Sequence, residues 1–136
     1  MKVIPMLVCR DGASEIEFCR AAFGAVEVAR RRTPDGTVVH AALAIGEEIV
    51  MVHGVFDHLA SRPPNADGSS PVVIYLYLDN VDIVIDRAVA AGAKVLLPAA
   101  DQSWGDRVGR ILDPAGHVWN IARRAATSLA PMSNPR

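Results

Sequence analysis

Apolar and polar positions along the chain are spaced in a way that predicts two helices and eight strands. The apolar residues Ile16, Cys19 and Phe23 recur at intervals of three and four, which predicts an amphipathic helix over residues 14–23. A second helix, capped by Asp79 or Asn80, is predicted over 81–91, where apolar residues again fall on one side. Short apolar or alternating segments bounded by turn-forming residues predict strands over 3–8, 26–32, 37–45, 48–53, 72–78, 94–97, 107–112 and 117–122. Each helix is therefore preceded by one strand and followed by three.

The two sets of predicted elements are related by an internal repeat. Asp11 and Asp79 precede the two helices and lie 68 positions apart, and Gly24 and Gly92, which follow the helices, are separated by the same 68 positions. Internal repeats indicate an architecture built from repeated units. The sequence therefore predicts two βαβββ modules, and we expect a ligand site between them.

A polar segment separates the two modules. Residues 62–71 consist almost entirely of turn formers, which predicts a linker over 55–70 between module one (1–54) and module two (71–124). A long loop of this kind is either disordered or acts as a lid over a site, and the sequence leaves both interpretations open. Residues 125–136 are polar and contain two prolines, so they are predicted to form a disordered tail after a single domain over 1–124.

Composition and charge exclude several classes of function. A chain of 136 residues has the size of one domain, and its net charge of -1 gives no electrostatic basis for binding nucleic acid or an anionic membrane. No apolar stretch approaches the roughly 20 residues of a membrane span, and the chain begins with a predicted strand instead of a signal peptide. Its two cysteines are too few for a disulfide scaffold, so we expect a cytoplasmic protein.

Two pairs of motifs resemble those of a known superfamily. Residues 16–18 (IEF) with 22–25 (AFGA), and 101–107 (DQSWGDR) with 113–119 (DPAGHVW), resemble the first helix and the last hairpin of the vicinal oxygen chelate superfamily. This superfamily contains glyoxalases, bleomycin-resistance proteins and ring-cleaving dioxygenases. The resemblance covers about residues 2–124. It implies an α+β fold in which two βαβββ modules form curved mixed sheets around a cup-shaped cavity.

The last of these motifs also has a structural explanation. Aspartate suits the first position of a type I turn, proline the second and glycine the fourth, and residues 113–116 satisfy all three preferences. We therefore expect this motif to form a hairpin turn, which supports the fold and says nothing about chemistry.

The resemblance also predicts where a metal would bind in relatives that use one. Such relatives hold a divalent ion with His, Glu or Gln side chains from four strands. Aligning the helix starts places these positions at Ile4 or Pro5, Met51 or Val52, Val73, and Asn120. None is a carboxylate or an imidazole, so we expect no metal and no other cofactor. The alternative is a divalent metal bound by unconventional ligands such as His40, His53 and Asn120.

The period of two along a strand predicts which side chains face the cavity. If Val73 faces it, Tyr75 and Tyr77 do so too, and Asn120 faces it from the last strand. The cavity would then carry two phenols and one amide on an apolar floor. Such a lining is typical of a pocket for a small, partly apolar ligand.

Four further residues complete the predicted ligand-binding set. Trp104 is placed to stack on a planar or cationic ligand, or equally to plug the edge of the sheet. Asp106 and Arg107 are adjacent on a strand and point to opposite faces, so one of them would reach the cavity and the other would brace the linker, although a surface or interface pairing is the alternative. His40 is a candidate general base or ligand contact. The predicted set is Tyr75, Tyr77, Trp104, Asp106, Arg107, Asn120 and His40.

The leading hypothesis is a glyoxalase/bleomycin-resistance-like homodimer that binds a small organic molecule in the inter-module cavity and lacks the metal site. Small two-fold dimers are the commonest oligomers, and the resemblance implies modules that pair across chains. One alternative is a metal-dependent lyase, isomerase or dioxygenase. Another is a resistance protein that sequesters a drug without chemistry. The sequence leaves open whether any reaction is catalysed.

Overall fold

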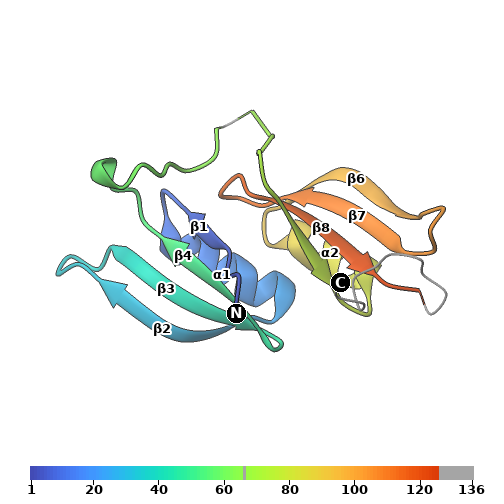
Figure 1. Ribbon diagram of the computed structural model, residues 1–136, viewed down its shortest axis with the longest axis horizontal. Coiled ribbons are helices and arrows are strands. Elements are labelled where there is room, and N and C mark those ends of the chain that lie inside the picture. The colour runs from blue at the N-terminus through green and yellow to red at the C-terminus, as the bar shows by residue number, and fades with distance from the viewer. Residues whose placement is uncertain (66, 126–136) are drawn as a thin grey trace.

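The computed structural model describes residues 1–65 and 67–125, and it contains the βαβββ unit twice (Figure 1). Module one comprises β1 (Met6–Val8), α1 (Gly12–Phe23), β2 (Val26–Arg32), β3 (Val38–Ile45) and β4 (Glu48–His53). Module two comprises β5 (Val73–Tyr77), α2 (Val81–Ala90), β6 (Lys94–Asp101), β7 (Arg107–Leu112) and β8 (Val118–Arg123). The linker contains a short 3-10 helix, η1 (Asp57–Leu59). Of the predicted tail, residues 126–136 lie outside the described part of the chain.

The two modules form separate mixed sheets with the same topology. The strand order is β1-β4-β3-β2 in one sheet and β5-β8-β7-β6 in the other. In each sheet the first strand runs parallel to the fourth, and the remaining neighbours are antiparallel. Met6 pairs with Met51 in module one and Tyr75 pairs with Asn120 in module two, so both residue numbers differ by 69 between the modules. The predicted α+β fold with two βαβββ modules is confirmed.

The helix ends show how the sequence positions these elements. The Asp11 side chain accepts a hydrogen bond of 3.1 Å from the backbone N–H of Ser14, which caps α1 at its start. Gly24 adopts the left-handed conformation at φ 69° and its N–H donates to the carbonyl of Arg20, which ends the helix. The second helix differs, because Asn80 occupies the capping position of α2 without a side-chain capping hydrogen bond. The predicted side-chain cap of α2 by Asn80 is therefore wrong.

The strands agree with the prediction to within about one residue at each end, apart from the start of β1 and the end of β6. The bounds of β4 and β7 are those predicted, whereas β1 begins at Met6 instead of residue 3. Pro5 has no N–H to donate, and only its carbonyl takes part, by accepting from Met51. At the opposite edge, β6 continues past Pro98 to Asp101, because an edge strand with an irregular register tolerates proline.

The helices join the two modules on one side of the sheets. Each helix covers its own sheet, and α1 also packs against α2 in a common apolar core. The Phe23 and Trp119 rings lie 4.8 Å apart across the module boundary. His117 Nε2 donates to the carbonyl of Val8 at 2.9 Å, which adds a polar contact between the modules. Figure 1 shows both sheets turned toward the viewer with the helices behind them, and the sheets of one chain do not close on each other.

No helix in residues 1–65 or 67–125 has the length and apolar character needed to cross a membrane.

Candidate functional site

The candidate site lies on the face of the module-two sheet that no helix covers, which we call the open face. Tyr75, Asn120 and Arg110 form one row across this face, since Tyr75 is the register partner of Asn120 and Asn120 that of Arg110. Arg110 Nε donates to Asn120 Oδ1 at 2.7 Å. Asn120 is buried, whereas 44% of Tyr75 is exposed. The row therefore combines a fixed polar base with an accessible aromatic ring.

A second pair of residues extends this row toward the end of β5. The rings of Tyr75 and Tyr77 are 5.2 Å apart and inclined by 31°, and the Arg124 guanidinium lies 4.8 Å from the centre of the Tyr77 ring. The Tyr77 hydroxyl donates to Asp106 Oδ2 at 3.2 Å, and Asp106 is fully buried. Burial raises the pKa of Tyr75, so its phenol keeps its proton at neutral pH and is available as a donor.

The structure thus brings four of the predicted residues together and places the other three elsewhere. The group on the open face consists of Tyr75, Tyr77, Asp106 and Asn120. Arg107 instead contacts Asp82 of α2 at 2.9 Å and Asp101 at 3.1 Å. Trp104 lies in the turn between β6 and β7 with 40% of its surface exposed. His40 belongs to the module-one sheet.

Arg110 is a residue of the site that is absent from the predicted set. The signal for it is present in the turn over 113–116, which closes with Gly116 N–H donating to the Asp113 carbonyl. Counting outward from this turn pairs Leu112 with Val118 and Arg110 with Asn120, as the structure shows. Strand periodicity counted from the start of β7 does not reveal this pairing, because it gives the face of a residue and not its cross-strand partner.

The metal positions of the superfamily are occupied by residues that do not suit a divalent ion. The resemblance places these positions at Ile4 or Pro5, Met51 or Val52, Val73 and Asn120, and in the structure Met51 pairs with Met6 and Asn120 pairs with Tyr75. Aliphatic side chains, a thioether and an amide do not match the imidazole and carboxylate ligands that zinc, manganese or iron prefer. Within the described residues, no group of three or more His, Cys, Asp or Glu side chains is arranged to hold a metal.

Two of the proposed unconventional ligands are neighbours in module one. His40 and His53 are register partners on β3 and β4, with ring centres 6.3 Å apart. His53 Nδ1 lies 2.8 Å from the carbonyl of Gly54, which requires that nitrogen to be the donor and leaves Nε2 as an acceptor. Asn120, the third unconventional ligand, lies in the other sheet and is held by Arg110. One chain therefore does not assemble the three predicted ligands.

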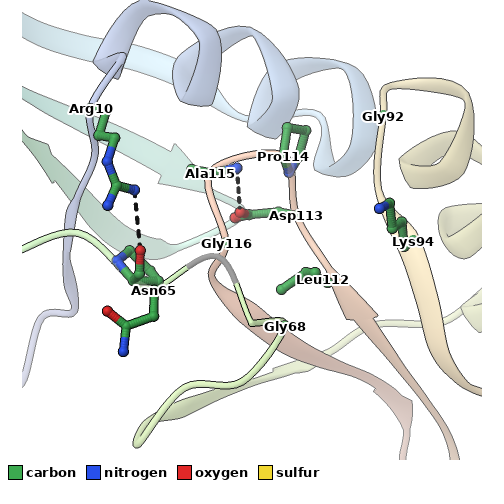
Figure 2. Close-up of a pocket in the computed structure, with 11 residues that line it drawn as sticks. Arg10, Asn65, Gly68, Gly92, Lys94, Leu112, Asp113, Pro114, Ala115 and Gly116 are labelled. Atoms are coloured by element: carbon green, nitrogen blue, oxygen red, sulfur yellow. Dashed lines mark hydrogen bonds between the residues drawn. The ribbon is translucent and has the colours of Figure 1, made fainter.

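Several cavities lie at the junction of the modules, and two of them lie beneath the linker. One of about 480 Å³ is bordered by Met6 and Val8 of β1, by Ile74 of β5, and by linker residues 62–65 and 69–71. Figure 2 shows the other, of about 400 Å³, between the linker and the turn over 113–116. None of the seven predicted ligand-binding residues lines either cavity.

Two buried acidic residues, Glu15 of module one and Asp113 of module two, lie at the junction of the modules. Asp113 accepts hydrogen bonds from the N–H groups of Ala115 and His117 and, at 2.9 Å, from Trp119 Nε1. Burial raises the pKa of Glu15 on α1 to about 11, and the neighbouring Asp113 carboxyl adds to the rise. Glu15 is therefore neutral at physiological pH.

A comparison with known protein families shows which superfamily the chain belongs to. The model of the glyoxalase/bleomycin resistance protein/dioxygenase superfamily matches residues 4–121. The chain belongs to this superfamily. Among curated relatives of this glyoxalase-superfamily chain is the uncharacterized protein Rv0887c of Mycobacterium tuberculosis, which is 42% identical over 122 residues, 88% of this chain and 72% of the relative.

Several solved structures show the same fold. TioX from Micromonospora sp. ML1 is similar with a TM-score of 0.71 and 28% identity, covering 93% of this chain and 98% of TioX. The fosfomycin resistance protein FosX from Mesorhizobium loti is similar with a TM-score of 0.65 and 19% identity, covering 93% of both chains. At that identity, the likeness to FosX concerns the fold alone.

Proposed function

We propose that this glyoxalase-superfamily protein binds a small organic molecule on the open face of module two, without the metal that many relatives use. The observation that carries the proposal is that the positions at which the resemblance places metal ligands, namely Ile4 or Pro5, Met51 or Val52, Val73 and Asn120, carry no carboxylate and no imidazole. A polar row on an otherwise apolar sheet face supports it, because ligand sites combine apolar surface with a few placed polar groups. The Tyr75–Tyr77 ring pair supplies the flat apolar part.

We further propose that a second copy of the chain covers the open faces and completes the site. Both sheets turn their open faces to the same side, so the two faces of one chain do not cover each other (Figure 1). These faces expose Met6 (47%), Val26 (64%) and Leu97 (54%). Apolar exposure of this kind marks interaction surfaces, and a two-fold dimer would set module one of each copy over module two of its partner.

The dimer is tested by sedimentation equilibrium on the full chain. The expected species has twice the 14.5 kDa mass of one chain, and Leu97→Asp should shift it toward the single-chain mass. A wild-type protein that stays at the mass of one chain at all accessible concentrations overturns the dimer and leaves ligand binding to be tested separately.

Ligand binding is tested by nuclear magnetic resonance with isotope-labelled protein and a library of small aromatic compounds. The expected result is that binders shift the Asn120 side-chain amide and the Tyr75 ring signals. Binders that shift only signals around the junction cavity, such as Ile74 and Val8, would contradict the proposed site. Tyr75→Ala should weaken binding, while Tyr75→Phe separates the role of the ring from that of the hydroxyl.

Metal-dependent chemistry is a second candidate that one observation favours, namely the neighbouring imidazoles of His40 and His53. Elemental analysis of protein purified without a histidine tag distinguishes the two functions. Less than a tenth of an equivalent of zinc, nickel, manganese or iron supports binding without metal. About one equivalent that is lost in both His40→Ala and His53→Ala would establish the metal-dependent candidate.

A further inference from the structure

Arg110 is a cation on the open face that has no acidic partner within the described residues. Three other arginines form ion pairs with nearby carboxylates, namely Arg20 with Glu17, Arg30 with Glu27, and Arg107 with Asp82 and Asp101. Arg110 instead uses Nε to hold Asn120 Oδ1 at 2.7 Å, and neither of its Nη atoms has a hydrogen-bond partner in residues 1–65 or 67–125. A half-buried guanidinium whose two Nη groups are free to donate can bind an anion.

The surroundings of Arg110 fix the direction in which this anion would lie. The bond to Asn120 orients the guanidinium, and Asn120 is itself buried at the centre of the sheet. Tyr75 is the register partner of Asn120 on the neighbouring strand, so the two side chains lie side by side on the open face. Tyr75, Asn120 and Arg110 therefore form a continuous polar chain across three neighbouring strands.

We propose that the ligand of this site is a planar carboxylic acid, whose carboxylate binds the two Nη atoms of Arg110 while its apolar part lies on the Tyr75 and Tyr77 rings. This inference rests on the proposed binding function and names its substrate class. The planar fork of arginine matches the two oxygens of a carboxylate, and such charge-assisted pairs are the stronger hydrogen bonds. The same positive charge disfavours a planar cation in this position.

The inference is tested with three probes that share one ring system and differ in charge: naphthoate, naphthamide and naphthylmethylamine. Dissociation constants are measured by nuclear magnetic resonance titration of the full chain, followed on the Tyr75 ring and Asn120 amide signals. Naphthoate should bind roughly ten-fold or more tightly than the neutral amide, because bonds to charged groups exceed neutral ones by about that factor. The amine should bind most weakly.

Variants of Arg110 separate its role from a structural one. Arg110→Gln should remove the preference for naphthoate over naphthamide, and Arg110→Lys, which keeps the charge without the fork, should retain part of it. Arg20→Gln is the matched control, because Arg20 lies on α1 on the far side of the sheets and should leave the preference unchanged. Unfolding curves establish that each variant is folded.

The outcomes distinguish this inference from the proposed function. If naphthamide and naphthoate bind equally at Tyr75 and Asn120, the carboxylate inference is wrong and the binding function stands. If Arg110→Gln folds and keeps the full preference for naphthoate, the inference is also wrong. If no probe perturbs the open face while the protein is folded, both the inference and the proposed function fail.

Discussion

The sharpest stability prediction concerns Glu15, the buried acid between α1 and the last hairpin. Only 1% of Glu15 is exposed, and neither carboxyl oxygen has a hydrogen-bond partner among the described residues. The titratable groups around it are Asp113, Cys9 and Cys19, and each of them interacts unfavourably with a charged Glu15. Replacing this residue by glutamine removes the titration while keeping the shape of the side chain.

The size of the effect follows from the difference between the folded and unfolded pKa values. The pKa of Glu15 is about 11 in the folded protein and 4.5 in the unfolded chain, so folding at neutral pH requires this group to take up a proton. Because the folded state binds the extra proton, the free energy of unfolding falls as pH rises, by about 1.4 kcal/mol per pH unit. From pH 4.5 to pH 7 this loss amounts to about 3 kcal/mol.

The assay is urea unfolding of the wild type and of Glu15→Gln at several pH values between 4.5 and 8. At each pH the free energy of unfolding of the wild type is subtracted from that of the variant. This difference should increase by about 3 kcal/mol between pH 4.5 and pH 7. Any change in packing caused by the amide alters the free energy of unfolding by the same amount at every pH. The test therefore depends on how the difference between variant and wild type changes with pH, and not on its absolute size. Glu17→Gln on the exposed side of the same helix is the control and should leave the slope unchanged.

A pH dependence that is identical in the wild type and in Glu15→Gln would refute this reasoning. It would mean that Glu15 ionises in the folded protein near its ordinary pKa, and that water or a rearranged Asp113 solvates its charge. A slope of opposite sign would show that folding stabilises the charged form of Glu15.

Three further predictions concern a close contact, a helix cap and the metal. Gly109→Ala should destabilise the fold by about 1–3 kcal/mol in urea unfolding, because its Cβ would lie 2.5 Å from Ile85 Cδ1 and 3.2 Å from the Ala99 backbone, and Ile85→Val should restore part of the loss. Asp11→Ala should cost about 1 kcal/mol through loss of the α1 cap, and an unchanged stability would show that the cap contributes nothing. Treatment with a strong chelator should leave Tm unchanged, and a large fall in Tm would contradict the metal-free proposal.

The sequence predicts the repeated module well because its signals are local. The spacing of apolar residues in α1, the left-handed glycine at Gly24 and the turn over 113–116 each depend on neighbouring residues, and all three are found in the structure. The start of β1 and the end of β6 were less predictable. The end of β6 depends on how it pairs with β7 across an irregular register, and the sequence signal stops at Pro98.

Strand periodicity predicted the face of the sheet on which residues of the candidate site lie, but not their contacts with other elements. A period of two correctly placed Tyr75 and Tyr77 on the face that also carries Asn120. It could not show that Arg107 turns toward Asp82, because that contact joins β7 to α2. Strand periodicity also could not predict that the two sheets do not close on each other, because the packing of α1 against α2 determines the relative orientation of the modules.

Equivalent positions in the two modules carry side chains of different chemistry. The cross-strand pair Met6–Met51 in module one corresponds to Tyr75–Asn120 in module two, so one module offers thioethers where the other offers a phenol and an amide. Thioether side chains adapt to irregular apolar surfaces, whereas the second pair orients polar groups. In the proposed two-fold dimer, each site would combine the apolar face of module one from one copy with the polar row of module two from the other. An apolar wall from one copy would then face the Tyr75–Asn120–Arg110 row of the other, which is the arrangement that an apolar molecule with one anionic end requires.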